Sequence, residues 1–140
     1  LQKFVNQPLV VNQIEVSLRH HYPISETILG NQQGGTYAGA TGTLDYCREH
    51  GVLVQAWSPL AGGKLSGAAA ELVTEMARAK GTSPEAVLLA WLLKHPAPIQ
   101  PIVGTTNPER LVASCAGDEV ELSREEWYSL LAAVRGVGVP

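Results

Sequence analysis

A loop of small residues follows an apolar run near the middle of the chain, and it carries groups that suit an anion. The run begins with Val52, Leu53 and Val54, which are apolar and mostly β-branched, and ends in the aromatic Trp57. The loop then passes from Ser58 through Gly62 to Lys64. In α/β proteins, ligands bind at the carboxyl ends of buried strands. Glycine lets backbone approach a phosphate closely, and successive N–H groups form an anion-binding nest. Lys64 is either a phosphate partner or a solvated lysine.

A second segment gives the sharpest local signal. An apolar run ends at Gly104, two hydroxyl residues follow at Thr105 and Thr106, and Asn107-Pro108 starts a helix. Proline is favoured at the first helical position after a capping residue. Because a helix N-terminus presents free N–H groups and the positive end of the dipole, this start is predicted to attract an anion.

Arg110 is the third residue of this predicted helix. A guanidinium there can hold a phosphate through two parallel hydrogen bonds. The alternative is an ordinary surface ion pair between Arg110 and Glu109 or Asp118. The local pattern therefore predicts a phosphate-binding α/β unit.

Other residues have a structural and a functional interpretation. Gln13 lies near the end of a predicted strand, where an amide bonds either backbone or a ligand amide. Trp57 is either a core aromatic or a platform for a ring. Trp91 and Trp127 lie on predicted helices, where packing is favoured. The adjacent histidines at positions 20 and 21 point apart, so we expect a solvated loop there, with a substrate-pocket role as the alternative.

The elements that position these residues alternate along the chain. Strands are predicted over residues 9–16, 52–57 and 99–104, and helices over 44–50, 68–80, 84–95, 108–115 and 124–135; residues 17–40 are predicted to form a long irregular loop. Thr43, Ser83 and Asn107 are the predicted N-caps, and Ser123 with Glu126 forms a capping box. This order predicts parallel strands with right-handed crossovers. Three parallel strands cannot close a barrel.

The composition bounds the class of protein. The chain has 140 residues, of which 45% are hydrophobic and 16% charged, and its net charge is −3. This length is enough for one domain at most. The net charge shows no excess of basic residues of the kind that binds nucleic acid. The apolar run 86–93 is too short to span a bilayer, and no signal peptide is visible, so we expect a cytoplasmic protein without a membrane partner. Cys47 and Cys115 lack metal-ligand spacing and are expected to be reduced thiols.

Three segments together resemble the aldo-keto reductase superfamily: VNQIE (11–15), QAWSPLAGGKL (55–65) and PIVGTTNPERL (101–111). Their order and spacing are similar to the sixth, seventh and eighth strands of that family's (β/α)8 TIM barrel. The resemblance implies an α/β fold in which residues 1–140 form the C-terminal, cofactor-binding half of the barrel. The proton-donating Tyr and its Asp, Lys and His partners follow the second to fourth strands of the family, so the catalytic half would precede Leu1. That start, at a residue other than Met, suggests a processed or truncated chain.

The resemblance also implies NADP (NADPH) as cofactor. Gln13 would bond the nicotinamide carboxamide, Trp57 would stack on the ring, the loop after Trp57 would contact the pyrophosphate, and the Arg110 region would hold the 2′-phosphate and adenine. The residues expected to bind the cofactor are Gln13, Trp57, Ser58, Pro59, Leu60, Gly62, Lys64, Gly104, Thr105, Thr106, Asn107, Arg110 and Ser114. Many family members carry a lysine where this chain has Gly104, which weakens the expectation of strict NADP preference.

The function implied is NADP-dependent reduction of aldehydes or ketones to alcohols. This chain would supply the nicotinamide-binding and 2′-phosphate-binding half. It would be inactive alone, because its four tyrosines and four histidines match none of the family's catalytic positions. The expected partners are a small carbonyl substrate and either the missing half of the barrel or a second copy. Two alternatives stay open: a non-catalytic nucleotide-binding module, and a half-barrel of another phosphate-binding TIM-barrel family in which Arg110 grips a sugar phosphate.

Overall fold

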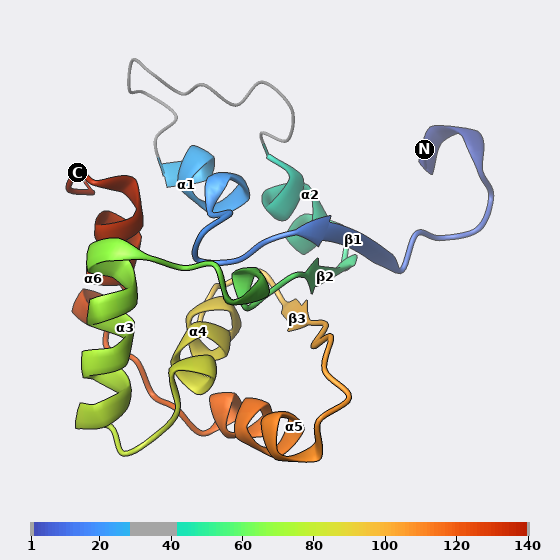
Figure 1. The fold of residues 1–140 in the computed structure, drawn as a ribbon. Coiled ribbons are helices and arrows are strands. Elements are labelled where there is room, and N and C mark those ends of the chain that lie inside the picture. Colours follow the sequence, from blue (N-terminus) through green and yellow to red (C-terminus); the bar gives the residue numbers. More distant parts are fainter. Residues whose placement is uncertain (1, 29–41, 140) are drawn as a thin grey trace.

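The computed structural model describes residues 2–28 and 42–139, which contain a three-stranded parallel sheet (Figure 1). The strands are β1 (Val11–Glu15), β2 (Leu53–Trp57) and β3 (Ile99–Pro101), and β2 lies between the other two. The predicted parallel pairing of three strands is therefore confirmed. The third strand is shorter than predicted. Pro101 has no N–H to donate to β2. Just beyond it, Ile102 N donates to Ala56 O of β2 at 2.9 Å.

Helices connect the strands and cover one face of the sheet. They are α1 (Tyr22–Ile28), α2 (Thr43–Glu49), α3 (Gly67–Ala79), α4 (Pro84–Leu93), α5 (Pro108–Cys115) and α6 (Arg124–Arg135). Short 3₁₀ turns form η1 (Gln2–Phe4), η2 (Ala61–Gly63) and η3 (Ala116–Asp118). The alternation of strands and helices follows the predicted order, with helix ends displaced by one or two residues.

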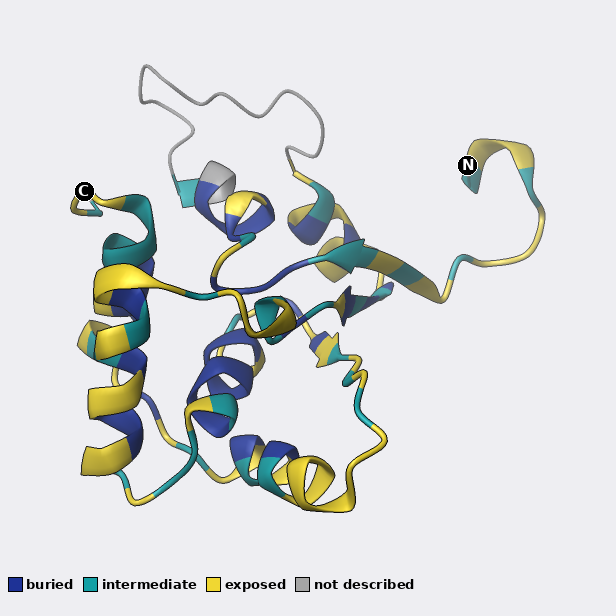
Figure 2. Cartoon of the chain, in the orientation of Figure 1, coloured by how far each residue is buried: buried dark blue, intermediate teal, exposed yellow. Residues whose placement is uncertain are grey.

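The sheet has one covered face and one open face. Successive side chains of a strand point to opposite faces, and in β2 the buried Val54 and Ala56 alternate with the half-buried Gln55 and the exposed Trp57. Helices α2 and α4 contact the sheet, and the burial pattern appears in Figure 2. We call the other side the open face; its strand residues are Val11, Gln13, Glu15, Leu53, Gln55, Trp57 and Gln100.

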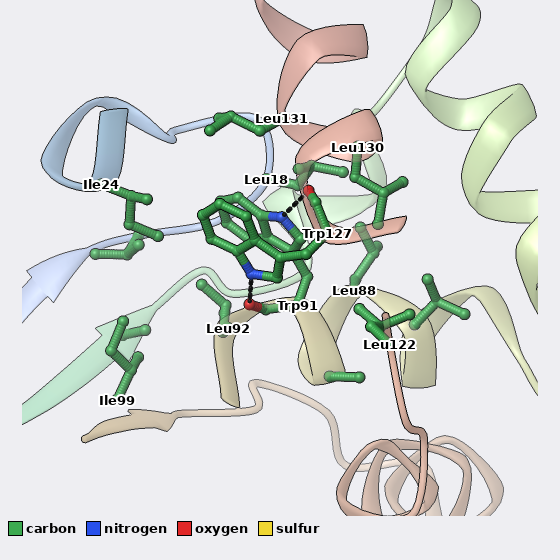
Figure 3. Close-up of a cluster of buried hydrophobic side chains, with 14 of the residues drawn as sticks. Leu18, Ile24, Leu88, Trp91, Leu92, Ile99, Leu122, Trp127, Leu130 and Leu131 are labelled. Atoms are coloured by element: carbon green, nitrogen blue, oxygen red, sulfur yellow. Dashed lines mark hydrogen bonds between the residues drawn. The ribbon is translucent and has the colours of Figure 1, made fainter. Parts of the chain in front are cut away.

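The core centres on α4, whose residues 86–92 are all buried. Trp91 of α4 and Trp127 of α6 stack there, with ring centroids 5.1 Å apart and an interplanar angle of 12° (Figure 3). Trp91 is fully buried and Trp127 is 7% exposed, so the predicted packing role of both residues is confirmed. Their contact joins α6 to the helix that contacts β3.

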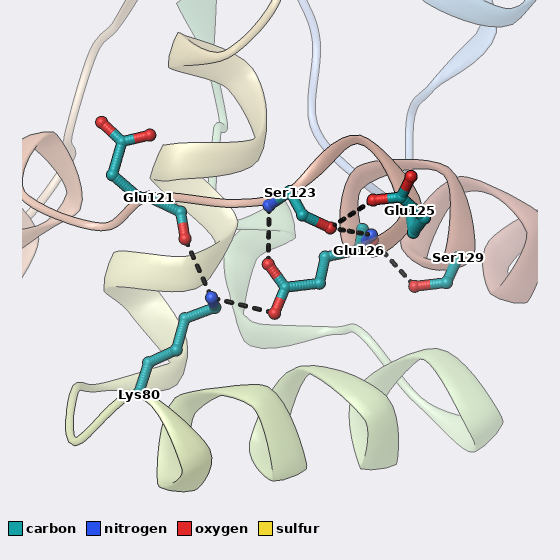
Figure 4. A network of polar contacts seen from close by, with 6 residues as sticks. All are labelled: Lys80, Glu121, Ser123, Glu125, Glu126 and Ser129. Atoms are coloured by element: carbon teal, nitrogen blue, oxygen red, sulfur yellow. Dashed lines mark hydrogen bonds and ion pairs between the residues drawn. The ribbon is translucent and has the colours of Figure 1, made fainter.

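A polar network joins the end of α3 to the start of α6 (Figure 4). Lys80 Nζ donates to Glu121 O at 2.8 Å and lies 2.9 Å from Glu126 Oε1. Glu126 also accepts from Ser123 N, and Ser123 Oγ accepts from Glu126 N, so the predicted capping box is confirmed. One carboxylate thus satisfies both a helix start and the lysine of a neighbouring helix.

Two of the three single N-caps are also as predicted. Ser83 Oγ accepts from Ala86 N at 3.1 Å, and Asn107 caps α5. The prediction for Thr43 is wrong: it is already helical, and Gly42 is the N-cap with φ 75°. Tyr46 N donates to Gly42 O at 2.8 Å, so the first helical hydrogen bond begins one residue earlier than the threonine.

The prediction of an irregular segment over residues 17–40 is wrong in its first part, because α1 forms there. Ile24 N and Ser25 N both donate to His21 O at 2.9 Å, and Ile24 is fully buried. His21 is not solvated as expected; it is 8% exposed, with Nδ1 2.7 Å from Ser25 Oγ. The rest of the predicted loop, residues 29–41, lies outside the described residues.

Candidate functional site

A cavity of about 780 Å³ is lined by the loop after β2 and by the segment after β3. Nine of the thirteen expected cofactor residues line it: Trp57, Ser58, Pro59, Leu60, Gly62, Gly104, Thr105, Arg110 and Ser114. The fold thus brings together the two segments that the sequence singled out separately. This arrangement follows from parallel pairing, because the carboxyl ends of β2 and β3 share one edge of the sheet.

The other four expected residues lie elsewhere. Gln13 is on the open face, where its amide bonds Gln55. Lys64 lines a smaller cavity of about 160 Å³ together with Arg19 and Glu15. Thr106 and Asn107 are exposed at the start of α5 but do not line the larger cavity.

The loop after β2 has a strained backbone. Ser58 and Ala61 have φ of 52° and 55°, in the left-handed region that disfavours residues with a Cβ. Such conformations cost on the order of 1–3 kcal/mol each and cluster at functional sites. The strain turns the chain sharply at the end of β2, so that Leu60 and Gly62 face the cavity.

Three amides of the predicted anion-binding nest after β2 are already hydrogen-bonded within the loop. Ala61 N donates to Ser58 O at 2.9 Å, Gly63 N to Leu60 O at 3.0 Å, and Lys64 N to Ala61 O at 3.1 Å. These three groups satisfy one another within the loop and its 3₁₀ turn. The prediction of successive free N–H groups is therefore wrong for them.

The backbone amides at the start of α5 are also hydrogen-bonded within the chain. Asn107 Oδ1 accepts from Glu109 N at 2.8 Å and from Arg110 N at 3.2 Å, and Leu111 N donates to Asn107 O at 3.0 Å. Pro108 has no N–H, so the first turn has no free amide. The prediction of free N–H groups here is wrong, because the cap that makes the helix start also occupies them.

Because these backbone amides are already bonded, Arg110 is the main cationic group in the lining of the larger cavity. Its side chain lines the cavity, and among the described residues no ion pair joins it to Glu109 or Asp118. Ser114, one turn later, is 6% exposed and its Oγ donates to Arg110 O at 2.8 Å. Thr105 Oγ1 accepts from Asn107 N at 3.2 Å, which holds that hydroxyl beside the helix start.

The remaining walls come from α3 and α4 and were not anticipated. Ala70, Val73 and Thr74 of α3, together with Pro84, Glu85 and Leu88 of α4, complete the cavity. These residues belong to ordinary helical patterns, so no sequence signal marks them as cavity walls. Their mostly apolar surface, an exposed indole at Trp57 and the guanidinium of Arg110 suit a ligand with a planar ring and an anionic group.

Residues 2–28 and 42–139 contain neither a cluster of metal ligands nor a membrane-spanning helix. Within these ranges no three His, Cys, Asp or Glu side chains gather as a metal site would require. No helix in the described part of the chain has the length and apolarity to cross a membrane.

Comparison with known proteins places these features in a family. Residues 8–135 match the model of the aldo/keto reductase family. A 6-dehydroglucose reductase of Agrobacterium fabrum is 36% identical over 140 residues, covering 97% of this chain and 42% of that protein. The chain therefore spans less than half the length of this relative.

Solved structures agree in fold. Aldose reductase from Giardia lamblia superposes with a TM-score of 0.69 at 26% identity, covering all of this chain and 42% of that one. An aldo/keto reductase from Klebsiella pneumoniae in complex with NADP and acetate gives a TM-score of 0.63 at 27% identity, covering 86% of this chain and 38% of that one. The expected fold class is confirmed: the three parallel strands are part of a TIM barrel. The chain belongs to the aldo/keto reductase family.

Proposed function

We propose that the chain is the C-terminal, cofactor-binding part of an NADP-dependent aldo-keto reductase that reduces aldehydes or ketones to alcohols. The observation that carries this proposal is the position of Arg110. Its guanidinium has no ion-pair partner among the described residues and lines the same cavity as Trp57 and Ser58. A guanidinium free of carboxylates suits a phosphate monoester.

The cavity residues that the sequence singled out have distinct roles in this proposal. Trp57, 43% exposed, offers an indole face for the nicotinamide ring, and the hydroxyls of Ser58 and Thr105 are placed for phosphate oxygens. Arg110 holds the 2′-phosphate, and Ser114 lies beside the adenine. The bound cofactor supplies the hydride. Because the amides of Ala61, Gly63 and Lys64 in one loop and of Glu109 and Arg110 in the other are already bonded, side chains carry most of the recognition of its phosphates.

Gln13, Lys64, Thr106 and Asn107 have less direct roles. Gln13 bonds the nicotinamide carboxamide from the open face, and Lys64, in the adjoining smaller cavity, attracts the pyrophosphate. Pro59, Leu60, Gly62 and Gly104 shape the cavity wall. Asn107 fixes the helix start that carries Arg110, and Thr106 leads into it.

The proposal requires a second part of the protein. An N-terminal half of the barrel, before Leu1 in the complete cytoplasmic protein, would cover the open face and supply the tyrosine that protonates the carbonyl oxygen. The relative from Klebsiella pneumoniae, crystallised with NADP, supports the choice of cofactor. The small-molecule carbonyl substrate would bind above the nicotinamide.

The test is a titration of the complete protein with NADPH, NADH and a sugar phosphate, followed by turnover of a reactive aldehyde. NADPH should bind most tightly and support turnover. Binding of the sugar phosphate alone would favour another phosphate-binding barrel family. Tight NADPH binding without turnover of any aldehyde or ketone would favour a nucleotide-binding module. The 140-residue chain by itself should show no NADPH-dependent turnover.

A further inference from the structure

Three glutamines form a continuous row across the open face. Gln13 of β1 lies opposite Gln55 of β2, and Gln55 lies opposite Gln100 of β3. Gln13 Nε2 donates to Gln55 Oε1 at 3.3 Å, and Gln55 Nε2 donates to Gln100 Oε1 at 2.9 Å. The row therefore links side chains 42 and 45 residues apart in sequence.

The hydrogen bonds of the row have one direction. A glutamine amide offers one acceptor oxygen and two N–H donors. Because Gln55 accepts from one neighbour and donates to the other, both ends of its amide are engaged. At the β1 end, no second bond joins the Gln13 amide to another residue in the described part of the chain, so its oxygen and its other N–H are available to a ligand.

Orientation is the property that such a row controls. The terminal torsion of glutamine is broad and roughly two-fold, so an isolated amide exchanges its oxygen and nitrogen positions readily. The bond from Gln13 Nε2 to Gln55 Oε1 favours one of the two arrangements. The arrangement of Gln55 is in turn favoured by Gln100, which accepts at the shorter of the two distances.

We propose that Gln55 and Gln100 are positioning residues that fix the amide of Gln13 for the carboxamide of a nicotinamide ring. This inference rests on the proposed function, because it takes NADP as the ligand. Trp57, the ring platform of that proposal, lies two residues beyond Gln55 on the same face. The oriented Gln13 accepts from the carboxamide N–H₂ with its oxygen and donates to the carboxamide oxygen with its second N–H.

The consequence is selectivity for an amide at this position of the ring. A cofactor analogue whose carboxamide is replaced by an acetyl group keeps the oxygen but lacks the N–H₂ donor. Gln13 Oε1 then faces a methyl group and has no donor. A Gln13 amide that is free to exchange its oxygen and nitrogen would lose less affinity for the analogue. It could turn its N–H₂ group toward the acetyl oxygen and keep that hydrogen bond in another geometry.

The test measures the dissociation constants of NADP⁺ and its 3-acetylpyridine analogue on the complete protein. The unmodified protein should favour NADP⁺ by about two- to tenfold, the equivalent of one neutral hydrogen bond. Gln55→Leu removes both links and should bring the ratio close to one. Gln55→Glu keeps an acceptor for Gln13 Nε2 and should restore most of the preference.

Matched variants separate positioning from folding. Gln100→Leu removes only the second link and should give an intermediate ratio. Gln7→Leu makes the same substitution at an exposed position outside the sheet and should leave the ratio unchanged. Thermal unfolding of each variant, with and without NADP⁺, verifies that the variants compared are folded.

Three outcomes would overturn the inference. If folded Gln55→Leu keeps the full preference while still binding NADP⁺, the row does not position Gln13. If Gln13→Leu keeps the preference, Gln13 does not contact the carboxamide, although the NADP site itself stands. If the unmodified protein binds neither dinucleotide, the proposed function fails, and this inference fails with it.

Discussion

The indole N–H groups of Trp91 and Trp127 each donate to the backbone carbonyl of the other residue. The bond from Trp127 Nε1 to Trp91 O is 2.8 Å and the reverse bond, from Trp91 Nε1 to Trp127 O, is 3.1 Å. Near the end of α4, Lys94 N donates to Ala90 O and His95 N to Leu92 O. The carbonyl of Trp91, between those two acceptors, therefore takes its donor from the side chain of α6.

Trp127→Phe should destabilise the protein by about 2–4 kcal/mol. The substitution keeps a ring but leaves the buried carbonyl of Trp91 without its donor, which alone costs about 1–3 kcal/mol, and it removes part of the stacked surface. Urea-induced unfolding measures the change. Tyr128→Phe is the control, since it removes a polar atom from the adjacent, less buried ring. Equal effects of the two substitutions would contradict the role of the indole N–H.

Gly117→Ala should destabilise the protein by about 1–3 kcal/mol, the usual range for overpacking. A Cβ at Gly117 would lie 2.8 Å from Leu89 Cβ and 3.2 Å from Ala86 O, both fixed on α4. Neither atom can move without displacing the helix. Gly138→Ala, where nothing lies within 4 Å, is the matched control and should change the unfolding midpoint little. A tolerated alanine at 117 would mean that η3 does not pack this closely on α4.

The free energy of unfolding should fall as the solution is acidified below about pH 6.5. Burial lowers the pKa of His21 below its ordinary value of 6.5, with the charge of Arg135 as the next contribution, and burial also lowers the pKa of His95. Just below pH 6.5, both rings therefore stay neutral in the folded protein but take up protons in the unfolded chain. Their contribution to the free energy of unfolding is present above pH 6.5 and is lost as pH falls through the folded pKa values.

Burial is the main reason that protonation of His95 is costly in the folded protein. Ala97 N donates to His95 Nδ1 at 3.1 Å, and a protonated Nδ1 could not accept that bond. Thermal melts from pH 8 to pH 5 should show a smaller decline for a variant carrying His21→Gln and His95→Gln than for the unmodified protein. A double variant with the same pH dependence would show that other groups control the decline.

Arg110→Ala should weaken NADPH binding about 10- to 100-fold and leave NADH binding nearly unchanged. A charge-assisted hydrogen bond is stronger than a neutral one, and the two cofactors differ only by the 2′-phosphate. Arg78→Ala, an exposed arginine of α3 outside the cavity, is the control. Calorimetric titration gives both constants. An equal loss for both cofactors would assign Arg110 to the pyrophosphate or to the fold instead.

The 140-residue chain, purified without any other part of a barrel, should self-associate. Within the described residues β1 and β3 each pair with one strand only, and the open face exposes Val11 and Trp57 by 41% and 43%. Unpaired edges and exposed apolar side chains favour association. Sedimentation velocity at micromolar concentration is the measurement. A monomer that melts cooperatively would contradict this expectation.

The elements with local chemical signals were predictable from the sequence. Ser83 before Pro84, Asn107 before Pro108 and the Ser123–Glu126 capping box each satisfy orphan amides within three residues, so their effect depends little on the rest of the fold. The two loops around Trp57 and Arg110 were predictable in the same way, because each ends a short apolar run.

What depends on long-range packing was not predictable. The helix α1 forms around Ile24, which is buried only because other elements pack on it. The glycines that follow in the sequence favoured the prediction of an irregular loop instead. The free amides expected at Ala61 and Arg110 are a different case, because their partners, Ser58 O and Asn107 Oδ1, lie only three residues away. Local turn and cap geometry, and not long-range packing, occupies those two amides. The row of glutamines depends on the register in which β1, β2 and β3 pair. The residues of a single strand do not reveal that register.

The chain's three tryptophans divide into two optical classes. The indoles of Trp91 and Trp127 are stacked and shielded, so they should give coupled near-ultraviolet circular dichroism and blue-shifted emission that report on the joint between α4 and α6. Trp57 is exposed beside the cavity, so its emission should be red-shifted and open to collisional quenching by iodide. Ligand occupancy and unfolding can therefore be followed in one sample through separate signals, with no added dye.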